Sequence, residues 1–124
     1  MPKIMVIDDS NSMRALIKQA LTAAGHQVIE AVDGQDALDR VATPGAASGI
    51  DLFLCDVNMP RVDGLTLVKK LRDLAPFKFK PILMLTTEID PEKKRIAKEA
   101  GATGWLVKPF QPDQLLATIR KVLT

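Results

Sequence analysis

Three aspartates stand directly after two short apolar runs, and their type and position suit the binding of a cation. Asp8 and Asp9 follow the run Ile4–Ile7, and Asp56 follows the run Leu52–Cys55. Carboxylate oxygens with no histidine or cysteine among them favour a hard cation such as Mg²⁺. An aspartate beside such a metal can act as a nucleophile toward phosphorus. The pattern therefore predicts a metal site at which an aspartyl phosphate can form.

Two more polar side chains close other apolar runs. Thr86 ends the run that begins at Ile82, and Lys108 follows Trp105–Val107. Singly, such a threonine could close a turn and such a lysine could be solvated. Three neighbouring anions, however, would repel one another strongly unless a cation held them. Because a hydroxyl and an ammonium group can stabilise a transferring phosphoryl group, Thr86 and Lys108 are predicted phosphate contacts.

Five strands and five helices must bring these residues together. The predicted strands are Ile4–Ile7, Val28–Ala31, Leu52–Cys55, Ile82–Leu85 and Trp105–Val107. Helical periodicity predicts helices between Met13 and Ala24 and over about Gly34–Ala42, Gly64–Leu74, Pro91–Ala100 and Pro112–Leu123. Alternating strands and helices indicate an α/β domain with a doubly wound parallel sheet. Such sheets bind ligands at the carboxyl ends of the strands, where all the candidate residues fall.

Composition limits what kind of protein this is. A chain of 124 residues with formal charge +2 fits one domain. No apolar run is long enough to cross a bilayer, so we expect a soluble, cytoplasmic protein. One Trp and no Tyr accompany the lysines and arginines, which argues against a nucleic-acid surface. Cys55, the only cysteine, lies in an apolar run and is expected to be buried, and Thr43–Gly49 is expected to be a surface loop.

The candidate residues belong to an ordered set of motifs. The motifs are Val6–Ser10, Asp56–Pro60 followed by Asp63 and Gly64, Leu85–Glu88, and Lys108–Phe110. This set resembles the bacterial response-regulator receiver domains of two-component systems, and the resemblance spans nearly the whole chain. It implies one receiver domain over residues 1–124. It also implies a flavodoxin-like sheet with strand order 2-1-3-4-5.

The resemblance implies a specific role for each acidic residue. Asp56 would be phosphorylated from a phosphohistidine of a sensor histidine kinase. Mg²⁺ would be held by Asp9, Asp56 and the backbone carbonyl of Asn58, and Asp8 would contribute through a water molecule. The protein would not be a conventional enzyme, although it would take part in its own phosphorylation and dephosphorylation.

A switch is implied as well. Thr86 and Lys108 would respond to the new charge, and the peptide bond between Lys108 and Pro109 would be cis. Thr86 would move toward the phosphoryl oxygens, which opens space into which the Trp105 ring can turn. The alternative for Trp105 is an ordinary strand aromatic packed half into the core.

Several residues point to the chemotaxis branch of the receivers. Asn58, two residues after Asp56, and Glu88, two after Thr86, match that branch and are predicted to tune dephosphorylation. The implied partners are a chemotaxis-type kinase and a flagellar motor switch protein or phosphatase, bound by a monomer. Trp105 is a departure from this pattern, since the chemotaxis protein has tyrosine there, and so is Thr87, where alanine is usual.

The predicted fourth helix is basic. Lys93, Lys94, Arg95 and Lys98 crowd it, and few large apolar residues interrupt them. This pattern indicates either a solvated helix face or an output surface for an acidic partner.

Other functions remain open. An aspartyl-nucleophile phosphatase usually needs a second Asp two residues after the first, where this chain has Ser10 after Asp8. A flavin carrier would need a hydroxyl- and glycine-rich loop after the first strand, where two carboxylates stand instead. A phosphate sink, a relay receiver outside chemotaxis and a scaffold without phosphochemistry are further alternatives.

Overall fold

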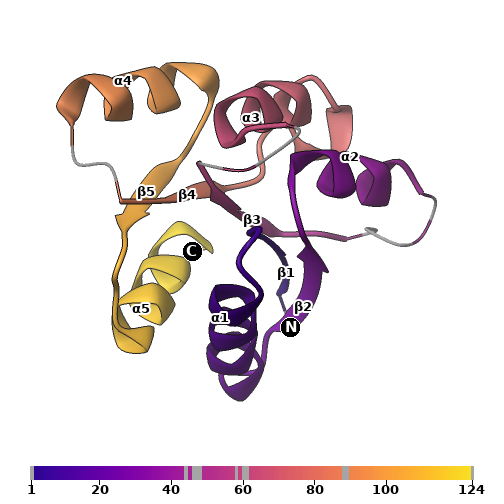
Figure 1. Ribbon diagram of the computed structural model, residues 1–124. Coiled ribbons are helices and arrows are strands. Elements are labelled where there is room, and N and C mark those ends of the chain that lie inside the picture. Colours follow the sequence, from indigo (N-terminus) through magenta and orange to yellow (C-terminus); the bar gives the residue numbers. More distant parts are fainter. Residues whose placement is uncertain are drawn as a thin grey trace.

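Five parallel strands form one sheet in the order β2-β1-β3-β4-β5, as the resemblance implied (Figure 1). The strands are β1 (Lys3–Ile7), β2 (Gln27–Ala31), β3 (Leu52–Asp56), β4 (Ile82–Thr86) and β5 (Gly104–Val107). The structure is a computed structural model that describes residues 2–43, 45, 49–57, 59, 62–87 and 90–123. Of the predicted loop Thr43–Gly49, residues 44 and 46–48 lie outside that description.

Helices cover both faces of the sheet (Figure 1). They are α1 (Asn11–Ala23), α2 (Gly34–Ala42), α3 (Gly64–Arg72), the short 3₁₀ helix η1 (Ala75–Phe77), α4 (Pro91–Ala100) and α5 (Pro112–Leu123). The predicted extension of α3 to Leu74 is wrong. Pro76 has no N–H to donate to the carbonyl of Arg72, so the helix cannot continue.

Two apolar clusters hold the three layers together. On one face, buried side chains of the sheet such as Phe53 and Met84 pack against α2, α3 and α4. On the other face, Ile17 and Leu21 of α1 and Ile119 of α5 pack against the sheet. All residues of β3 and β4 are buried, as expected of central parallel strands. The carboxyl ends of these strands are therefore fixed by packing on both sides.

Side-chain caps fix where the helices after the strands begin. The Ser10 Oγ accepts a hydrogen bond from the Met13 N–H at 3.2 Å and starts α1 three residues after β1. Asp33 and Asp63 cap α2 and α3 in the same way. Each cap ends the loop that carries polar residues at this edge of the sheet. None of the helices in the described part of the chain has the length and apolarity to span a bilayer.

Candidate functional site

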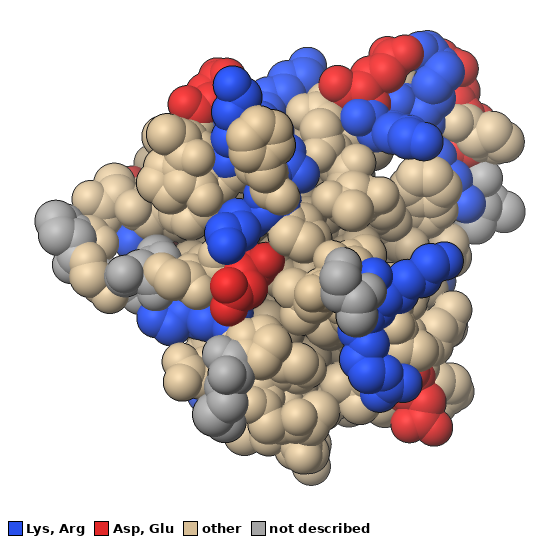
Figure 2. All heavy atoms as spheres, turned by 180° about the vertical axis from the view of Figure 1, so that it is seen from behind, with Lys and Arg blue, Asp and Glu red and all other residues tan. Residues whose placement is uncertain are grey.

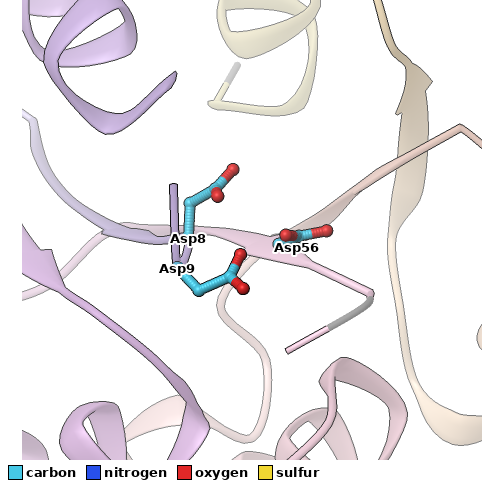
Figure 3. A group of neighbouring side chains, drawn as sticks. All are labelled: Asp8, Asp9 and Asp56. Carbon is cyan, nitrogen blue, oxygen red and sulfur yellow. The ribbon is translucent and has the colours of Figure 1, made fainter. Parts of the chain in front are cut away.

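Three carboxylates meet at the carboxyl ends of β1 and β3. Figure 3 shows Asp8, Asp9 and Asp56 directed toward a common space. One oxygen of each lies within 4.8 Å of the others. Asp8 and Asp56 are only 0% and 6% exposed, whereas Asp9 is open to solvent. Two buried carboxylates and an accessible third one therefore border one space.

Lys108 reaches the same space from the segment after β5. Its ammonium nitrogen lies 3.2 Å from an Asp8 oxygen and 3.4 Å from an Asp56 oxygen. The backbone N–H of Lys108 donates a hydrogen bond to the Thr86 carbonyl at 2.7 Å. The peptide bond between Lys108 and Pro109 is cis. One ammonium group cannot neutralise three carboxylates. The site therefore keeps excess negative charge, which favours a further cation.

The side chain and the backbone carbonyl of Asp8 both accept hydrogen bonds from other residues of the chain. One carboxylate oxygen accepts the Ser10 N–H at 2.8 Å, and the other faces Lys108. Its backbone carbonyl accepts from the Arg14 guanidinium at 2.8 Å, and Arg14 also pairs with Glu30 at 3.3 Å. Arg14 therefore ties β1, α1 and β2 together behind the carboxylates. Asp9, by contrast, is exposed to solvent.

Gly64 allows α3 to begin directly against the Asp56 segment. A Cβ at Gly64 would lie 2.5 Å from the Asp56 carbonyl oxygen and 2.8 Å from the Val57 Cα. Both are backbone atoms, which cannot rotate out of the way.

We expect Gly64→Ala to lower the free energy of unfolding by about 1–3 kcal/mol, because the added methyl group overpacks this contact. Urea unfolding measures the change. Gly104→Ala is the matched control, since its Cβ would meet only the flexible Leu83 side chain at 3.4 Å. Equal losses in the two variants would contradict the steric explanation.

Cys55 lies behind Asp56 in β3 and is fully buried. Burial, and then the nearby carboxylates of Asp56, Asp63 and Asp8, raise the pKa of its thiol far above the ordinary range. The thiol therefore stays protonated, and its Sγ lies 3.4 Å from the Asp56 carbonyl oxygen. The prediction of a buried cysteine is confirmed.

A cavity of about 330 Å³ adjoins the site on the side of α4. Thr86, Met84, Ala97 and Trp105 are among its lining residues. Trp105 is half-buried, and the Lys94 ammonium lies 5.0 Å from the centre of its ring. Thr86, the last residue of β4, therefore borders this cavity together with Trp105 of β5.

The charges on α4 are partly paired among themselves. Arg95 binds Glu92 and, at 2.6 Å, Glu99, so the helix presents both signs to solvent. In Figure 2, which views the molecule from behind, basic and acidic side chains stand side by side over this helix at the upper right. Ala97 is the only buried residue of α4. The helix is therefore held by few core contacts.

Residues 4–120 match the family model of the response regulator receiver domain. The chain belongs to the response regulator receiver domain family. The three carboxylates at the ends of β1 and β3 therefore lie in a response regulator receiver domain.

Individual receivers resemble the chain over nearly its whole length. Chemotaxis protein CheY1 of Helicobacter pylori is 38% identical over 122 residues, which cover 98% of this chain and 96% of that protein. A CheY homolog of Campylobacter jejuni is also 38% identical, covering 98% and 92% of the two chains. The solved structure of CheY4 from Vibrio cholerae is 46% identical and covers 99% of both chains with a TM-score of 0.92. The chain is therefore a CheY-like response regulator receiver.

The structure brings together most residues that the sequence singled out in this receiver. Asp8, Asp9, Asp56 and Lys108 share one space, and Thr86 borders it. Asn58 and Glu88 lie outside the described residues, so their predicted roles stay predictions. The sequence pattern does not indicate which groups Arg14 and Lys94 contact. Their contacts join elements that only the folded chain brings together.

Proposed function

We propose that this receiver is a phospho-acceptor switch of a chemotaxis two-component system and that Asp56 is its acceptor. An Asp56 carboxylate oxygen attacks the phosphorus of a kinase phosphohistidine, the P–N bond breaks, and an acyl phosphate forms. The observation that carries the proposal is the position of Asp56. It lies beside two other carboxylates that can hold a cation and 3.4 Å from the Lys108 ammonium.

The metal in this proposal is Mg²⁺, and the described residues fit it. Asp9 and Asp56 would be its carboxylate ligands, Asn58 would add its backbone carbonyl, and Asp8 would act through a water molecule. Bound Mg²⁺ supplies positive charge that shields the incoming phosphoryl group from the carboxylates. Lys108 would add a second positive charge, because its ammonium group already faces Asp56.

The output in this proposal is a change of affinity for a partner. The chemotaxis names of the relatives support a sensor histidine kinase as donor and a flagellar motor switch protein or phosphatase as target. The receiver itself would act in the cytoplasm. Asn58 and Glu88 would tune the lifetime of the phosphoryl group. A phosphate sink for the kinase is the alternative output. Comparing partner capture with and without beryllofluoride distinguishes the two, because a sink needs no target that prefers the phosphorylated form.

Mg²⁺ and acetyl phosphate test the proposal on the chain alone. Mg²⁺ should raise the unfolding temperature, because it binds carboxylates that repel one another in the folded state. Acetyl phosphate with Mg²⁺ should add one phosphoryl mass to the intact protein, and EDTA should prevent the addition. A melting curve indifferent to Mg²⁺, or phosphoryl addition in EDTA, would contradict the metal-dependent chemistry.

Trp105 should report the switch. Beryllofluoride with Mg²⁺ is expected to change its fluorescence, because Thr86 turns toward the phosphoryl mimic and the ring gains space in the cavity. A charge-assisted hydrogen bond drives this step. As the only tryptophan in the sequence, Trp105 gives a signal from one position.

The controls for this signal are two variants. Asp56→Asn should not respond at all, and Thr86→Ala should respond much less than the parent. An equal change in Thr86→Ala and parent would mean that Trp105 responds by another route. A silent parent would support the alternative that Trp105 is a fixed core aromatic.

A further inference from the structure

Phe79 stands almost wholly in solvent at the end of the molecule opposite the carboxylates. It is 89% exposed, more than any other large apolar side chain in the described ranges. Burying a phenylalanine side chain stabilises a folded protein, so this exposure forgoes a stabilising contact. Because Phe79 precedes β4 and Asp56 ends β3, the two residues lie at opposite edges of the sheet. Phe79 can therefore be covered while Asp56 is accessible.

The backbone that carries Phe79 is held in place. The Arg72 guanidinium donates to the carbonyls of Phe77 at 2.8 Å, Lys78 at 3.1 Å and Lys80 at 2.6 Å. Phe77 itself is buried, with its ring 5.2 Å from that of Phe53 in an edge-to-face contact. Phe79 is thus displayed by an ordered segment. A partner that covers it loses little entropy in ordering this loop.

A groove of about 560 Å³ lies beside Phe79. Its apolar lining consists of Pro2, Phe79, Pro81, Val122 and Leu123. Asp51 and Lys80 also line it and lie 3.8 Å apart as an ion pair, which leaves the groove itself nearly neutral. The groove can accept an apolar side chain from a partner next to the Phe79 ring.

Two lysines stand beside the exposed ring of Phe79. Lys78 and Lys80 flank Phe79 in the sequence, and the Lys78 ammonium lies 5.9 Å from the centre of the Phe79 ring. Two copies of this chain pairing through the same surface would bring their lysines together, which disfavours a symmetric dimer. The two lysines, one of them already paired with Asp51, offer little positive charge to the backbone of a nucleic acid. Acidic side chains around an apolar anchor match both the lysines and the groove.

We propose that Phe79 and this groove form a docking surface for an acidic segment of a partner protein. The segment places an apolar side chain beside Phe79 and carboxylates near Lys78 and Lys80. The surface is separate from the phosphorylation site. Docking there holds the chain near its partner whether or not Asp56 is modified, so it does not depend on the function proposed above.

Selection of short peptides from a displayed random library on the immobilised full chain tests this proposal. The enriched peptides should combine aspartate or glutamate with a large apolar residue. Their affinity, measured with synthetic copies, should fall roughly tenfold or more in Phe79→Ala, as for a central anchor residue, and clearly in Lys78→Glu. Amide shifts in NMR spectra should change around residues 78–81 and the end of α5.

Two controls make the result specific. Leu16→Ala removes another exposed apolar side chain, one on α1 that is 50% exposed, and should leave the affinity unchanged. Asp56→Asn should also leave it unchanged, which separates this surface from phosphorylation-dependent output. Thermal melts confirm that each variant is folded.

Several outcomes would overturn the proposal. They are no enriched peptide, enriched peptides that are neutral or basic, and binding that survives Phe79→Ala. Self-association that disappears in Phe79→Ala would assign the surface to a second copy of the chain. Oligonucleotide binding that depends on Phe79 would assign it to a nucleic acid.

Discussion

Asp56→Asn is expected to abolish phosphoryl addition from acetyl phosphate. The substitution keeps the shape of the side chain but replaces the nucleophilic carboxylate oxygen with a neutral amide. It also removes one partner of Lys108, which lies 3.4 Å from an Asp56 oxygen. Intact-mass measurement should show one added phosphoryl group on the parent and none on the variant.

Asp51→Asn is the matched control for this experiment. Asp51 is also a carboxylate next to β3, but it lies at the amino end of that strand, with Lys80 at 3.8 Å. Its variant should be labelled as fully as the parent. Labelling that persists in Asp56→Asn would move the acceptor to another residue, and Asp9, the exposed carboxylate of the cluster, would be the first to examine.

Mg²⁺ affinity should fall much further in Asp9→Asn than in Asp8→Asn. Both Asp8 oxygens already accept hydrogen bonds, from the Ser10 N–H and from Lys108, so Asp8 is placed to act on the metal through water. Loss of such an outer contact typically costs roughly 10- to 100-fold in metal affinity. We expect Asp8→Asn to lower the Mg²⁺ affinity by roughly tenfold, the low end of this range. Because Asp9 is the proposed direct ligand, Asp9→Asn should lower the affinity by more than roughly 100-fold. Isothermal titration calorimetry measures both.

The comparison needs a check on folding, because Asp8 is buried and bonded to the backbone. Thermal melts without Mg²⁺ show whether Asp8→Asn has lost structure. Asp9 is exposed, so its variant should melt near the parent or above it, since one repelling charge is gone. Equal affinity losses in two folded variants would contradict the assignment of a direct ligand and a water-bridged one.

The position of the carboxylates was predictable because the carboxyl ends of parallel strands meet at one edge of a sheet. Apolar runs located β1, β3 and β4, and the residue after each run then had to lie at that edge. The link from Lys108 to Asp8 spans 100 residues, yet it follows from the same rule. The family motifs supplied what geometry alone did not, namely the strand order and the division of roles among the aspartates.

Contacts that depend on particular side-chain directions were not predictable. Nothing in the sequence marks Arg72 as the residue that binds four carbonyl groups, those of Phe77, Lys78, Lys80 and Gly101. The helix α3 ends at Arg72, before the predicted Leu74, because Pro76 has no N–H to donate to the Arg72 carbonyl. The cavity beneath α4 could not be predicted either, because its size depends on the distance between the sheet and a helix with few buried residues.

The Arg72 contacts give α4 one anchored end. The guanidinium donates to the Gly101 carbonyl at 2.9 and 2.7 Å, directly after the last turn of the helix, while the first turns border the cavity. The helix has 10 residues, and these contacts hold its carboxyl end. A tilt of about 10° at the anchored end would move the far end, roughly 15 Å away, by about 2–3 Å. Of the α4 residues that line the cavity next to Thr86, Lys93 and Lys94 lie far from the anchored end and would move most in such a tilt, whereas Ala97 lies close to that end and would move little.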